Sequence, residues 1–570
     1  MRSISVADRA DLKMAEVDSV PETRQDEGIL GLLNECLAEQ QQLTAVERFA
    51  RLHDQDELPA QATYYRSLIP LSTPGPGQQY GFEVDLDVCS GCKACVTACH
   101  SLNGLESGET WRSVGLLHGG NADHPMQKTV TTACHHCLEP ACMHGCPVGA
   151  YEKDGLTGIV RHLDDQCIGC QYCVLTCPYE VPQYSSKKGI VRKCDMCAGR
   201  LSEAEAPACV QACPNTAISI QIVDKAAMIE DAQGDTFLPG VPSPGITLPT
   251  THYKTTTVFP RNMLPADFYS VRPAHQHMPL VFMLVLTQLS VGAFCADQLL
   301  PVWLSPETLV RLRPFQGFLA LALGMLALVA STLHLGRPQY AWRAFIGLKT
   351  SWLSREIFAF GAYAGMAVLY GAALYIGNQH AVEILGHAVA LSGVVALFCS
   401  VMLYHVTQRM WWNGGRTGFK FACTAAILGW STILLCTFGA TVGSEARLSD
   451  ELIQFGRTGA FGLLLLTLIK LGGEASVFLH LGDAQQGDLK RSALLLWGDL
   501  RYLTQARFLL GAFGGLFLPL MLLTTLTPSS QGQAFVGSLL SLICLLIGET
   551  LERMTFFTAL SAPRMPGGLQ

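Results

Sequence analysis

The sequence predicts an α+β domain built from short repeats, followed by an all-α polytopic membrane bundle of about eight helices. Two observations support this division. Sixteen of the 22 cysteines lie between Cys89 and Cys213, and long apolar runs follow from Pro279 onward. Charge divides the chain at the same place, since residues 1–270 carry 20 Lys and Arg against 33 Asp and Glu, whereas the rest carries 19 against 13. At 570 residues, two or more domains are expected.

The cysteines form four groups of four, and three of the groups end in a Cys-Pro pair. Cysteines separated by two residues on a tight loop can direct several thiolates to one iron–sulfur cube, and a fourth cysteine before proline reaches a second cube. The spacing therefore predicts sixteen metal ligands that hold four [4Fe-4S] clusters. The groups are Cys89/Cys92/Cys95/Cys99, Cys134/Cys137/Cys142/Cys146, Cys167/Cys170/Cys173/Cys177 and Cys194/Cys197/Cys209/Cys213.

Zinc sites and disulfide bonds are the alternatives for these cysteines. Structural zinc also uses Cys-x2-Cys pairs, but it needs two pairs per ion and no cysteine leading into proline. A disulfide framework is typical of short secreted chains. The fourfold repeat favours iron–sulfur clusters over both. Nucleic-acid binding is not expected, because the sequence has no basic patch with interleaved aromatic residues.

Residues 1–75 form an N-terminal extension that is predicted to be partly helical. Apolar residues from Ile29 to Leu37 recur at helical spacing, and residues 44–47 have the form of a capping box before a second helix. The extension either docks a partner or packs on its own domain. Residues 76–231 form the cluster domain, in which 82–86 and 158–162 are expected to be short strands that lead into cysteine loops.

Residues 232–274 are rich in Pro, Gly and Thr and are predicted to wrap a neighbour or to link to the membrane half. Residues 275–560 contain eight apolar runs long enough to cross a bilayer, and residues 561–570 form a tail. Loops on the side of the cysteine domain carry eleven Lys and Arg residues against four on the other side. This bias predicts a multi-pass inner-membrane protein whose cysteine domain faces the cytoplasm. The runs are 279–299, 315–335, 356–376, 382–405, 420–441, 458–480, 507–526 and 534–556.

Three histidines, His334, His405 and His480, fall at the ends of these runs nearest to the cysteine domain. A histidine at a membrane surface can bind a quinol hydroxyl and accept its proton, because its pKa lies near neutrality. Arg337 follows the first of them and Glu356 opens the third run, so that histidine and carboxylate can converge at this boundary. Haem b held by two histidines is the alternative, and no haem is expected because no pair is singled out.

Two parts of the sequence resemble subunits of the dimethyl sulfoxide reductase family of molybdoenzymes. Residues 80–270 resemble the four-cluster, tandem ferredoxin-like electron-transfer subunit in Cys89-Ser-Gly-Cys-Lys-Ala-Cys, Cys134-His-His-Cys and Cys167-Ile-Gly-Cys-Gln-Tyr-Cys. Residues 275–560 resemble the eight-span membrane anchor in His334-Leu-Gly-Arg-Pro and Ser351-Trp-Leu-Ser-Arg-Glu. The protein thus looks like two subunits fused into one.

The resemblance implies how the groups share clusters. In that family the first and fourth groups hold one pair of clusters, and the second and third groups hold the other pair. Because Cys170 is present, four cubanes are implied and not a three-iron cluster. The implied ligand sets are Cys89, Cys92, Cys95 and Cys213; Cys194, Cys197, Cys209 and Cys99; Cys134, Cys137, Cys142 and Cys177; and Cys167, Cys170, Cys173 and Cys146.

The resemblance also implies a quinol-oxidising subunit of an anaerobic respiratory complex. A menaquinol or ubiquinol from the membrane would be oxidised at His334, with Glu356 as a second proton acceptor. Arg337, His405 and His480 are expected around this site from their position at the same boundary. The electrons would pass through the clusters to a separate molybdopterin-containing catalytic subunit that reduces a sulfoxide, an N-oxide or nitrate.

Two other functions stay open at this point. The same clusters could carry electrons in reverse, from a dehydrogenase of formate or another donor to quinone, since ligand identity does not fix direction. A proton-coupled transporter with a metal-regulated domain is the other alternative, and it would use Lys470 and Glu474. These two residues lie four apart on one predicted helix and are expected to form an ion pair.

Overall fold

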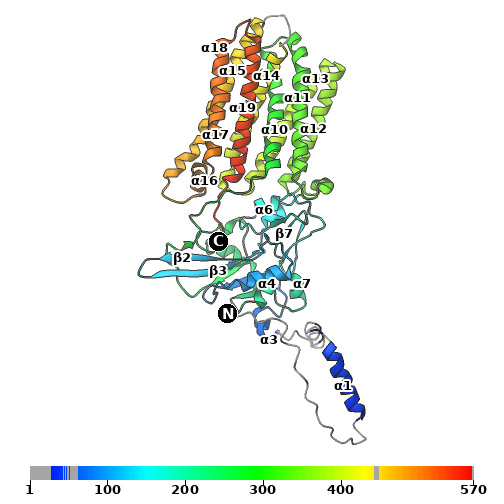
Figure 1. Cartoon of the computed structure of the whole chain (residues 1–570), viewed down its shortest axis with the longest axis vertical. Coiled ribbons are helices and arrows are strands. Elements are labelled where there is room, and N and C mark those ends of the chain that lie inside the picture. Colours follow the sequence, from blue (N-terminus) through cyan, green and yellow to red (C-terminus); the bar gives the residue numbers. More distant parts are fainter. Residues whose placement is uncertain are drawn as a thin grey trace, which may run out of the picture. The chain divides into compact units, whose positions relative to one another are not determined.

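The computed structural model divides the protein into two compact units, Met1–Tyr64 and Tyr65–Gln570. Figure 1 labels many of their helices and some of their strands. The residues that the structure describes are 27–42, 44, 47, 51, 62–441 and 448–567.

The first unit contains helix α1 (Glu27–Gln42), at the position of the predicted helical spacing. Thr44 and Glu47 form the reciprocal bonds of a capping box, with N–H to side-chain oxygen distances of 2.8 and 3.2 Å. The helix predicted to follow lies mostly outside the described residues. Four apolar side chains of α1 are exposed: Leu30, Leu32, Leu33 and Leu37.

The cysteine-bearing half of the second unit consists of short strands and helices of one to three turns. Four small sheets have the strand orders β8-β1-β9, β10-β2-β3, β4-β5 and β6-β7. Besides the short helices α3 (Ala62–Tyr65), η2 (Arg66–Leu68) and η3 (Pro244–Ile246), the elements are β1 (Gln78–Asp85), α4 (Ala94–Leu102), β2 (Ser113–Gly120), β3 (Pro125–Thr132), α5 (Ala141–His144), β4 (Tyr151–Lys153), β5 (Val160–His162), α6 (Tyr172–Thr176), β6 (Gln183–Ser185), β7 (Ile190–Arg192), α7 (Ala198–Ser202), α8 (Ala208–Gln211), β8 (Ile218–Asp224), α9 (Lys225–Gln233), β9 (His252–Lys254) and β10 (Leu264–Pro265).

Strand pairing brings the first and last cysteine groups together. Strand β1 leads into the first group and pairs antiparallel with β8, which follows the last group, from Gln78 opposite Asp224 to Val84 opposite Ile218. The hairpins β4-β5 and β6-β7 lead into the third and fourth groups. Both predicted strands before cysteine loops are present, as β1 and β5.

The segment 232–274 runs along the cysteine domain before it enters the bundle. Strand β9 pairs with β1, and β10 pairs with β2. The insertion between the first two cysteine groups forms the β2-β3 hairpin, and its Trp111 is buried. The segment therefore wraps its own domain.

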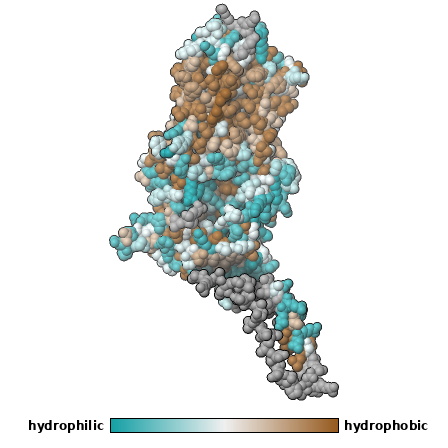
Figure 2. Space-filling model, in the orientation of Figure 1, coloured by the Kyte–Doolittle hydropathy of each residue, from teal (hydrophilic) through white to brown (hydrophobic). Residues whose placement is uncertain are grey.

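Eight helical segments are long and apolar enough to cross a membrane, among the residues that the structure describes. Figure 2 shows their apolar side chains as a brown band across the visible face of the bundle. The fold class predicted from the sequence is confirmed. The helices are α10 (Met278–Asp297), α11 (Pro306–Thr332), α12 (Trp352–Ile376), α13 (Gln379–His405), α14 (Gly414–Gly439), α15 (Asp450–Ala475), the pair α17 (Arg501–Ala512) and α18 (Leu518–Thr525), and α19 (Gln531–Thr558).

The helices begin before the predicted apolar runs, most clearly in the case of α11. That helix begins at Pro306, about nine residues early, because its first turns carry Glu307, Arg311 and Arg313 and lower the local hydropathy. Spans α17 and α18 are joined by the π-helical turn η8 (Phe513–Phe517). A short amphipathic helix, α16 (Asp488–Trp497), precedes them and was not predicted.

Helices α10 and α14 form the centre of the bundle. The most apolar windows of these two spans are 67% and 78% buried, against 22–33% for the other six. A methyl group at Gly292 would overlap the backbone of Ala425, and one at Gly429 would overlap the backbone of Gly292. The two glycines therefore allow the backbones of α10 and α14 to touch, as small residues do in membrane helix pairs.

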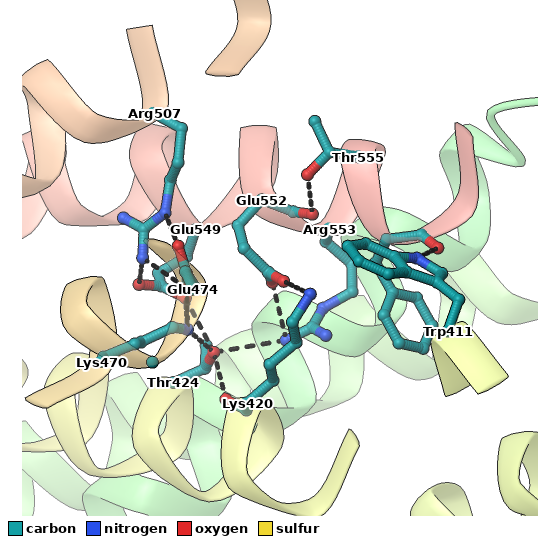
Figure 3. Close-up of polar contacts among 12 residues, drawn as sticks. Trp411, Lys420, Thr424, Lys470, Glu474, Arg507, Glu549, Glu552, Arg553 and Thr555 are labelled. Carbon is teal, nitrogen blue, oxygen red and sulfur yellow. Dashed lines mark hydrogen bonds and ion pairs between the residues drawn. The ribbon is translucent and has the colours of Figure 1, made fainter. Parts of the chain in front are cut away.

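A buried ion network joins α14, α15, α17 and α19 (Figure 3). Its centre is Glu549, which is 0% exposed and contacts both Lys470 and Arg507, the latter at 2.8 Å. Thr424 donates a hydrogen bond to the same carboxylate at 2.7 Å. Arg507 also binds Glu474 through two bonds of 3.0 and 3.1 Å. The predicted Lys470–Glu474 pair is present at 3.5 Å as one part of this larger network.

A second carboxylate extends the network toward α10. Glu552 lies 3.1 Å from Lys420 and 3.4 Å from Arg553. Arg553 donates to Gln288 on α10 at 2.9 Å and stacks on Phe421. Each charge thus has a partner of opposite sign, which only for Arg553 lies on the same helix, and this favours a structural role because unpaired charge in a bilayer is costly.

Removing one carboxylate tests this role. Glu549→Gln leaves Lys470 and Arg507 short of a countercharge, so we expect a loss of about 3–5 kcal/mol of stability. SDS-induced unfolding of the purified protein in detergent, followed by circular dichroism, measures the loss. Glu383→Gln, on an exposed part of α13, is the control and should leave the transition unchanged. Equal transitions for both variants would contradict the role.

Candidate functional site

The four cysteine loops share one backbone feature. A residue with positive φ stands immediately before the second cysteine of each group, with values of 73° at Gly91, 43° at His136, 70° at Gly169 and 60° at Met196. This conformation turns the loop tightly, so that its side chains converge. Backbone N–H groups donate to the sulfur atoms of Cys146, Cys167, Cys194 and Cys213 at 3.2–3.4 Å.

Two sets of cysteines mix the first and fourth groups. We call Cys89, Cys92, Cys95 and Cys213 the distal set: burial, and then the charges of the other three, raise the pKa of Cys89. We call Cys99, Cys194, Cys197 and Cys209 the third set. Burial, followed by Cys209 and Cys197, raises the pKa of Cys99 to about 12. All four members of the third set line one small cavity.

Two further sets mix the second and third groups. Cys134, Cys137, Cys142 and Cys177, the second set, line another cavity together. Burial raises the pKa of Cys142 well above its usual value, and the charges of the other members of the second set add to it. Cys146, Cys167, Cys170 and Cys173 form the membrane-proximal set, in which burial and then Cys146 and Cys167 raise the pKa of Cys170. These four sets are the ones that the resemblance implied.

Electrostatic effects between cysteines of different sets show which sets are neighbours. The charge of Cys142 raises the pKa of Cys173, so the second set neighbours the membrane-proximal set. In the same way, the charge of Cys134 raises the pKa of Cys194, so the second and third sets are neighbours. The charge of Cys209 raises the pKa of Cys95, so the third and distal sets are neighbours. The four sets therefore form a line with two ends.

The chemistry of these sites fits iron–sulfur clusters. None of the sixteen cysteines forms a disulfide. The second and third sets each line a cavity with four cysteines, and backbone N–H groups donate to cysteine sulfur atoms, as in cluster sites. The Arg112 side chain is 2% exposed beside these thiols, and its Nη2 has no hydrogen-bond partner. A buried cation is costly unless a negative charge lies beside it, and a bound cluster with its thiolates would supply that charge.

The membrane-proximal set lies against the anchor half. Backbone N–H groups of Gly336 and Arg337 donate to Gly169 and Ile168, in the loop of the third cysteine group, at 3.4 and 3.0 Å. A methyl group at Gly336 would overlap the carbonyl oxygen of Gly189. These contacts fix which end of the line of sets lies at the membrane, a point that the sequence left open.

The residues before α12 hold the loop that follows Cys146. Gly347 N–H donates to the carbonyl of Pro147 at 2.8 Å, and Ser351 Oγ donates to the carbonyl of Gly145 at 2.8 Å. The motif around Ser351 therefore docks the cysteine domain directly.

His334 lies at this contact, between the membrane-proximal set and the first span. Its ring meets His277 at 5.4 Å between centroids, and its pKa is lowered by burial although a backbone bond to Cys170 opposes the shift. Burial, and then His334 and His275, lower the pKa of His277 to about 3. Both imidazoles are therefore neutral at neutral pH. His334 Nε2 and His277 Nδ1 are buried without a hydrogen-bond partner.

Glu356 lies on α12, the helix that begins next to Ser351. It is 5% exposed in the first turns of α12 and accepts a hydrogen bond from Ser400 on α13. Burial, and then the charge of Glu356, raise the pKa of Tyr172, whose hydroxyl donates to the Leu403 carbonyl at 2.7 Å. Tyr172 stands between two ligands of the membrane-proximal set, so Glu356 is close to that set.

The other predicted site residues have local partners. Arg337 Nη1 donates to the carbonyl of Asp164 at 3.0 Å, which makes it a docking residue. His405 accepts from the N–H of Gly414 at 3.2 Å, and His480 binds Asp483 at 2.8 Å. Neither histidine is shown to contact His334.

Sequence reasoning missed His277 and Tyr172. His277 precedes the first apolar run together with His275, and its pairing with His334 requires the folded bundle. Tyr172 had a usable signal, because it lies between Cys170 and Cys173 and a buried tyrosine needs a hydrogen-bond acceptor.

Residues 273–559, just over half of the sequence, match the protein family described as the DMSO reductase anchor subunit (DmsC). This protein is a member of that family. The matched range includes both His334 and Glu356. Residues 126–223 match the 4Fe-4S dicluster domain family.

Similarity to known iron–sulfur proteins covers the cysteine domain. The B subunit of the anaerobic dimethyl sulfoxide reductase of Haemophilus influenzae is 37% identical over 157 residues, 26% of this protein and 76% of the relative. The B subunit of the Escherichia coli K12 enzyme is 37% identical over 155 residues, 26% and 75% of the two proteins. The hydrogenase-2 operon protein HybA of Escherichia coli O157:H7 is 35% identical over 171 residues, 25% and 52%.

The predicted resemblance is therefore confirmed. The protein is an iron–sulfur electron-transfer subunit fused to a DMSO reductase anchor, and it is a multi-pass membrane protein.

The contact at Gly336 can be tested by adding one methyl group. Gly336→Ala should force the anchor away from Gly189 and the loop at 167–177, at a cost of about 1–3 kcal/mol. Hydrogen–deuterium exchange of that loop should then become faster. Gly361→Ala, where nothing lies within 4 Å of the added carbon, is the matched control and should leave exchange unchanged. Equal protection in the two variants would show that the contact does not hold the loop.

Proposed function

We propose that this protein oxidises a membrane quinol beside His334 and Glu356 and passes the electrons through four [4Fe-4S] clusters to a separate molybdopterin catalytic subunit. That subunit would reduce a sulfoxide, an N-oxide or nitrate. The observation that carries the proposal is the position of both residues beside the membrane-proximal set: His334 bonds to the backbone of Cys170, and the charge of Glu356 raises the pKa of Tyr172, which lies between Cys170 and Cys173. A quinol oxidised there would lie next to the first cluster site, so its electrons could transfer directly to that cluster.

The proposed chemistry balances two protons and two electrons. Oxidation of menaquinol or ubiquinol to the quinone breaks two O–H bonds. His334, neutral and with a free ring nitrogen, accepts one proton, and the Glu356 carboxylate accepts the second. Bound clusters supply one-electron carriers, so the two electrons leave one at a time. The His277 ring packs edge-on against that of His334, with 5.4 Å between centroids, and can orient it by this contact.

The distal set is the proposed exit. Cys92 is exposed and Cys89 is half-buried, whereas the cysteines of the other sets are mostly buried. A catalytic subunit docked over Cys92 would receive electrons from the distal set. The names of the two dimethyl sulfoxide reductase relatives support a partner of that type.

The proposed location is the inner membrane, with the iron–sulfur domain on the cytoplasmic face. The excess of Lys and Arg in loops on that side supports it. Some of these residues also dock the cysteine domain, as Arg337, Arg343 and Arg409 do through backbone carbonyls. The excess of Lys and Arg on that side therefore reflects both membrane orientation and docking of the cysteine domain.

Metal analysis tests the number and kind of clusters. Four cubanes predict about sixteen iron and about sixteen sulfide per protein molecule, and no Soret band if haem is absent. Cys170→Ser should lower the iron content by up to about four, since it removes one ligand of one set. Cys436→Ser, in the membrane half, is the control and should leave iron unchanged. Two to four zinc ions in place of iron would overturn the proposal.

Quinol-driven reduction of the clusters tests the site. His334→Ala and Glu356→Gln should each slow bleaching of the iron–sulfur absorbance by quinol about 10²-fold or more, because each removes a proton acceptor. Dithionite should still reduce the same clusters fully. His387→Ala, on an exposed turn of α13, is the control. Unchanged quinol rates in both variants would place the quinol elsewhere.

A further inference from the structure

Two buried cations lie at the junctions between cysteine sets, and no step proposed above uses them. Lys193 is 3% exposed and Arg112 is 2% exposed. Neither forms an ion pair with a carboxylate among the residues that the structure describes. Burying such groups without a countercharge is costly, so their placement needs a reason.

Lys193 joins the second and third sets. Its Nζ lies 3.6 Å from the sulfur of Cys134, in the second set, and 2.8 Å from the carbonyl oxygen of Cys194, in the third set. It also donates to the carbonyl of Val160. The amine is thus fixed between the two sets by bonds to the cysteine loops themselves.

Arg112 joins the third and distal sets. Its side chain lines the cavity formed by the third set and stacks on Phe82 at 4.7 Å. Nη1 donates to Thr131 Oγ1 at 3.2 Å, and that oxygen lies 3.6 Å from the sulfur of Cys95 in the distal set. The cysteines whose charges raise the pKa of Arg112 belong to both sets and are Cys209, Cys95, Cys194 and Cys99.

The membrane-proximal set differs. Backbone N–H groups donate to the sulfur atoms of Cys146 and Cys167 at 3.3 and 3.4 Å, and the neighbouring His162 is paired with Asp164 at 2.8 Å. In the part of the sequence that the structure describes, no lysine or arginine side chain forms a hydrogen bond with a cysteine of this set. The second set, by contrast, has Lys193 beside the sulfur of Cys134 and Arg409 on the carbonyl of Cys177 at 3.2 Å. Side-chain cations that bond directly to cysteines therefore begin with the second set, whereas Arg337 and Arg343 bond to the carbonyls of Asp164 and Asp165, before Cys167.

We propose that Lys193 and Arg112 set the direction of electron flow, by making the clusters beyond the membrane-proximal set easier to reduce than the one beside the anchor. A fixed positive charge stabilises the reduced, more negative cluster and raises its reduction potential. An electron that leaves the quinol is then drawn away from the membrane toward the distal set. This inference rests on the proposed function, and it favours quinol oxidation over the reverse flow from a dehydrogenase to quinone.

Redox titration of the full-length protein, followed by electron paramagnetic resonance, tests the two cations. Lys193→Gln and Arg112→Gln should each shift the reduction equilibrium of the adjoining clusters at least about tenfold toward the oxidised form, which is about 59 mV lower per one-electron centre. Lys193→Arg and Arg112→Lys keep the charge and should retain the parent potentials. Lys187→Gln, an exposed lysine of the same domain, is the control.

Iron content separates a structural role from an electrostatic one. If the two cations only support the fold, the neutral and charge-conserving variants lose iron alike and the remaining clusters keep the parent potentials, which would overturn the inference. Parent potentials in fully loaded Gln variants would overturn it too. Each cation is tested alone. If its Gln variant does not bind a full complement of iron, the reduction potentials of Lys193→Met and Arg112→Met are measured instead and are interpreted by the same criteria.

The direction of electron flow is tested by measuring how far a mixture of quinol and quinone reduces the clusters. With equal quinol and quinone present, the Gln variants should hold fewer electrons on the clusters than the parent protein. If quinol reduces no cluster in the parent protein while the titrated potentials still shift, the proposed function fails and the electrostatic role stands. If quinol reduces the clusters equally well in all variants, the directional role fails and the quinol site stands.

Discussion

The close contact between the third cysteine loop and the segment after α11 determines how the two halves of this protein work together. Gly169, Gly189 and Gly336 meet there backbone to backbone, and side chains larger than hydrogen would separate them. Backbone hydrogen bonds from Gly336 and Arg337 satisfy the carbonyls of the loop. Because these bonds are made by main-chain atoms, they hold the loop at a fixed height over the bundle. His334 and Glu356 owe their nearness to the membrane-proximal set to this contact.

The cysteine pattern predicted the loops well, because three ligands of each set lie close in sequence and need only a tight turn. The fourth ligand is different. Cys213 reaches the distal set only because β1 pairs with β8, and that pairing joins residues about 140 positions apart. Spacing alone cannot reveal such a partner, so the sets were available only through the resemblance to a known family. The order of the sets and the end that touches the membrane required the packed structure.

Hydropathy located the eight spans but not the ionic network inside them. The sequence showed Lys470 and Glu474 on one helix, where spacing of four residues makes a pair visible. Glu549 and Arg507, which complete the network, come from other helices, and no local rule connects them. The same limit applies to His277, whose partner His334 lies on another segment. Interactions between elements distant in sequence are thus what the pattern could not supply.

The buried cations of the cysteine domain also bear on assembly. Arg112 and Lys193 lie among thiols that burial keeps protonated, since it raises the pKa of Cys99, Cys142 and Cys194. Without clusters, the two positive charges would have neither a carboxylate nor a thiolate beside them, which is a costly arrangement. Insertion of clusters deprotonates the thiols and supplies the missing negative charge. Metal binding and folding are coupled in this way wherever ligands must lose protons, so the residues that tune electron flow also make the folded domain depend on its clusters.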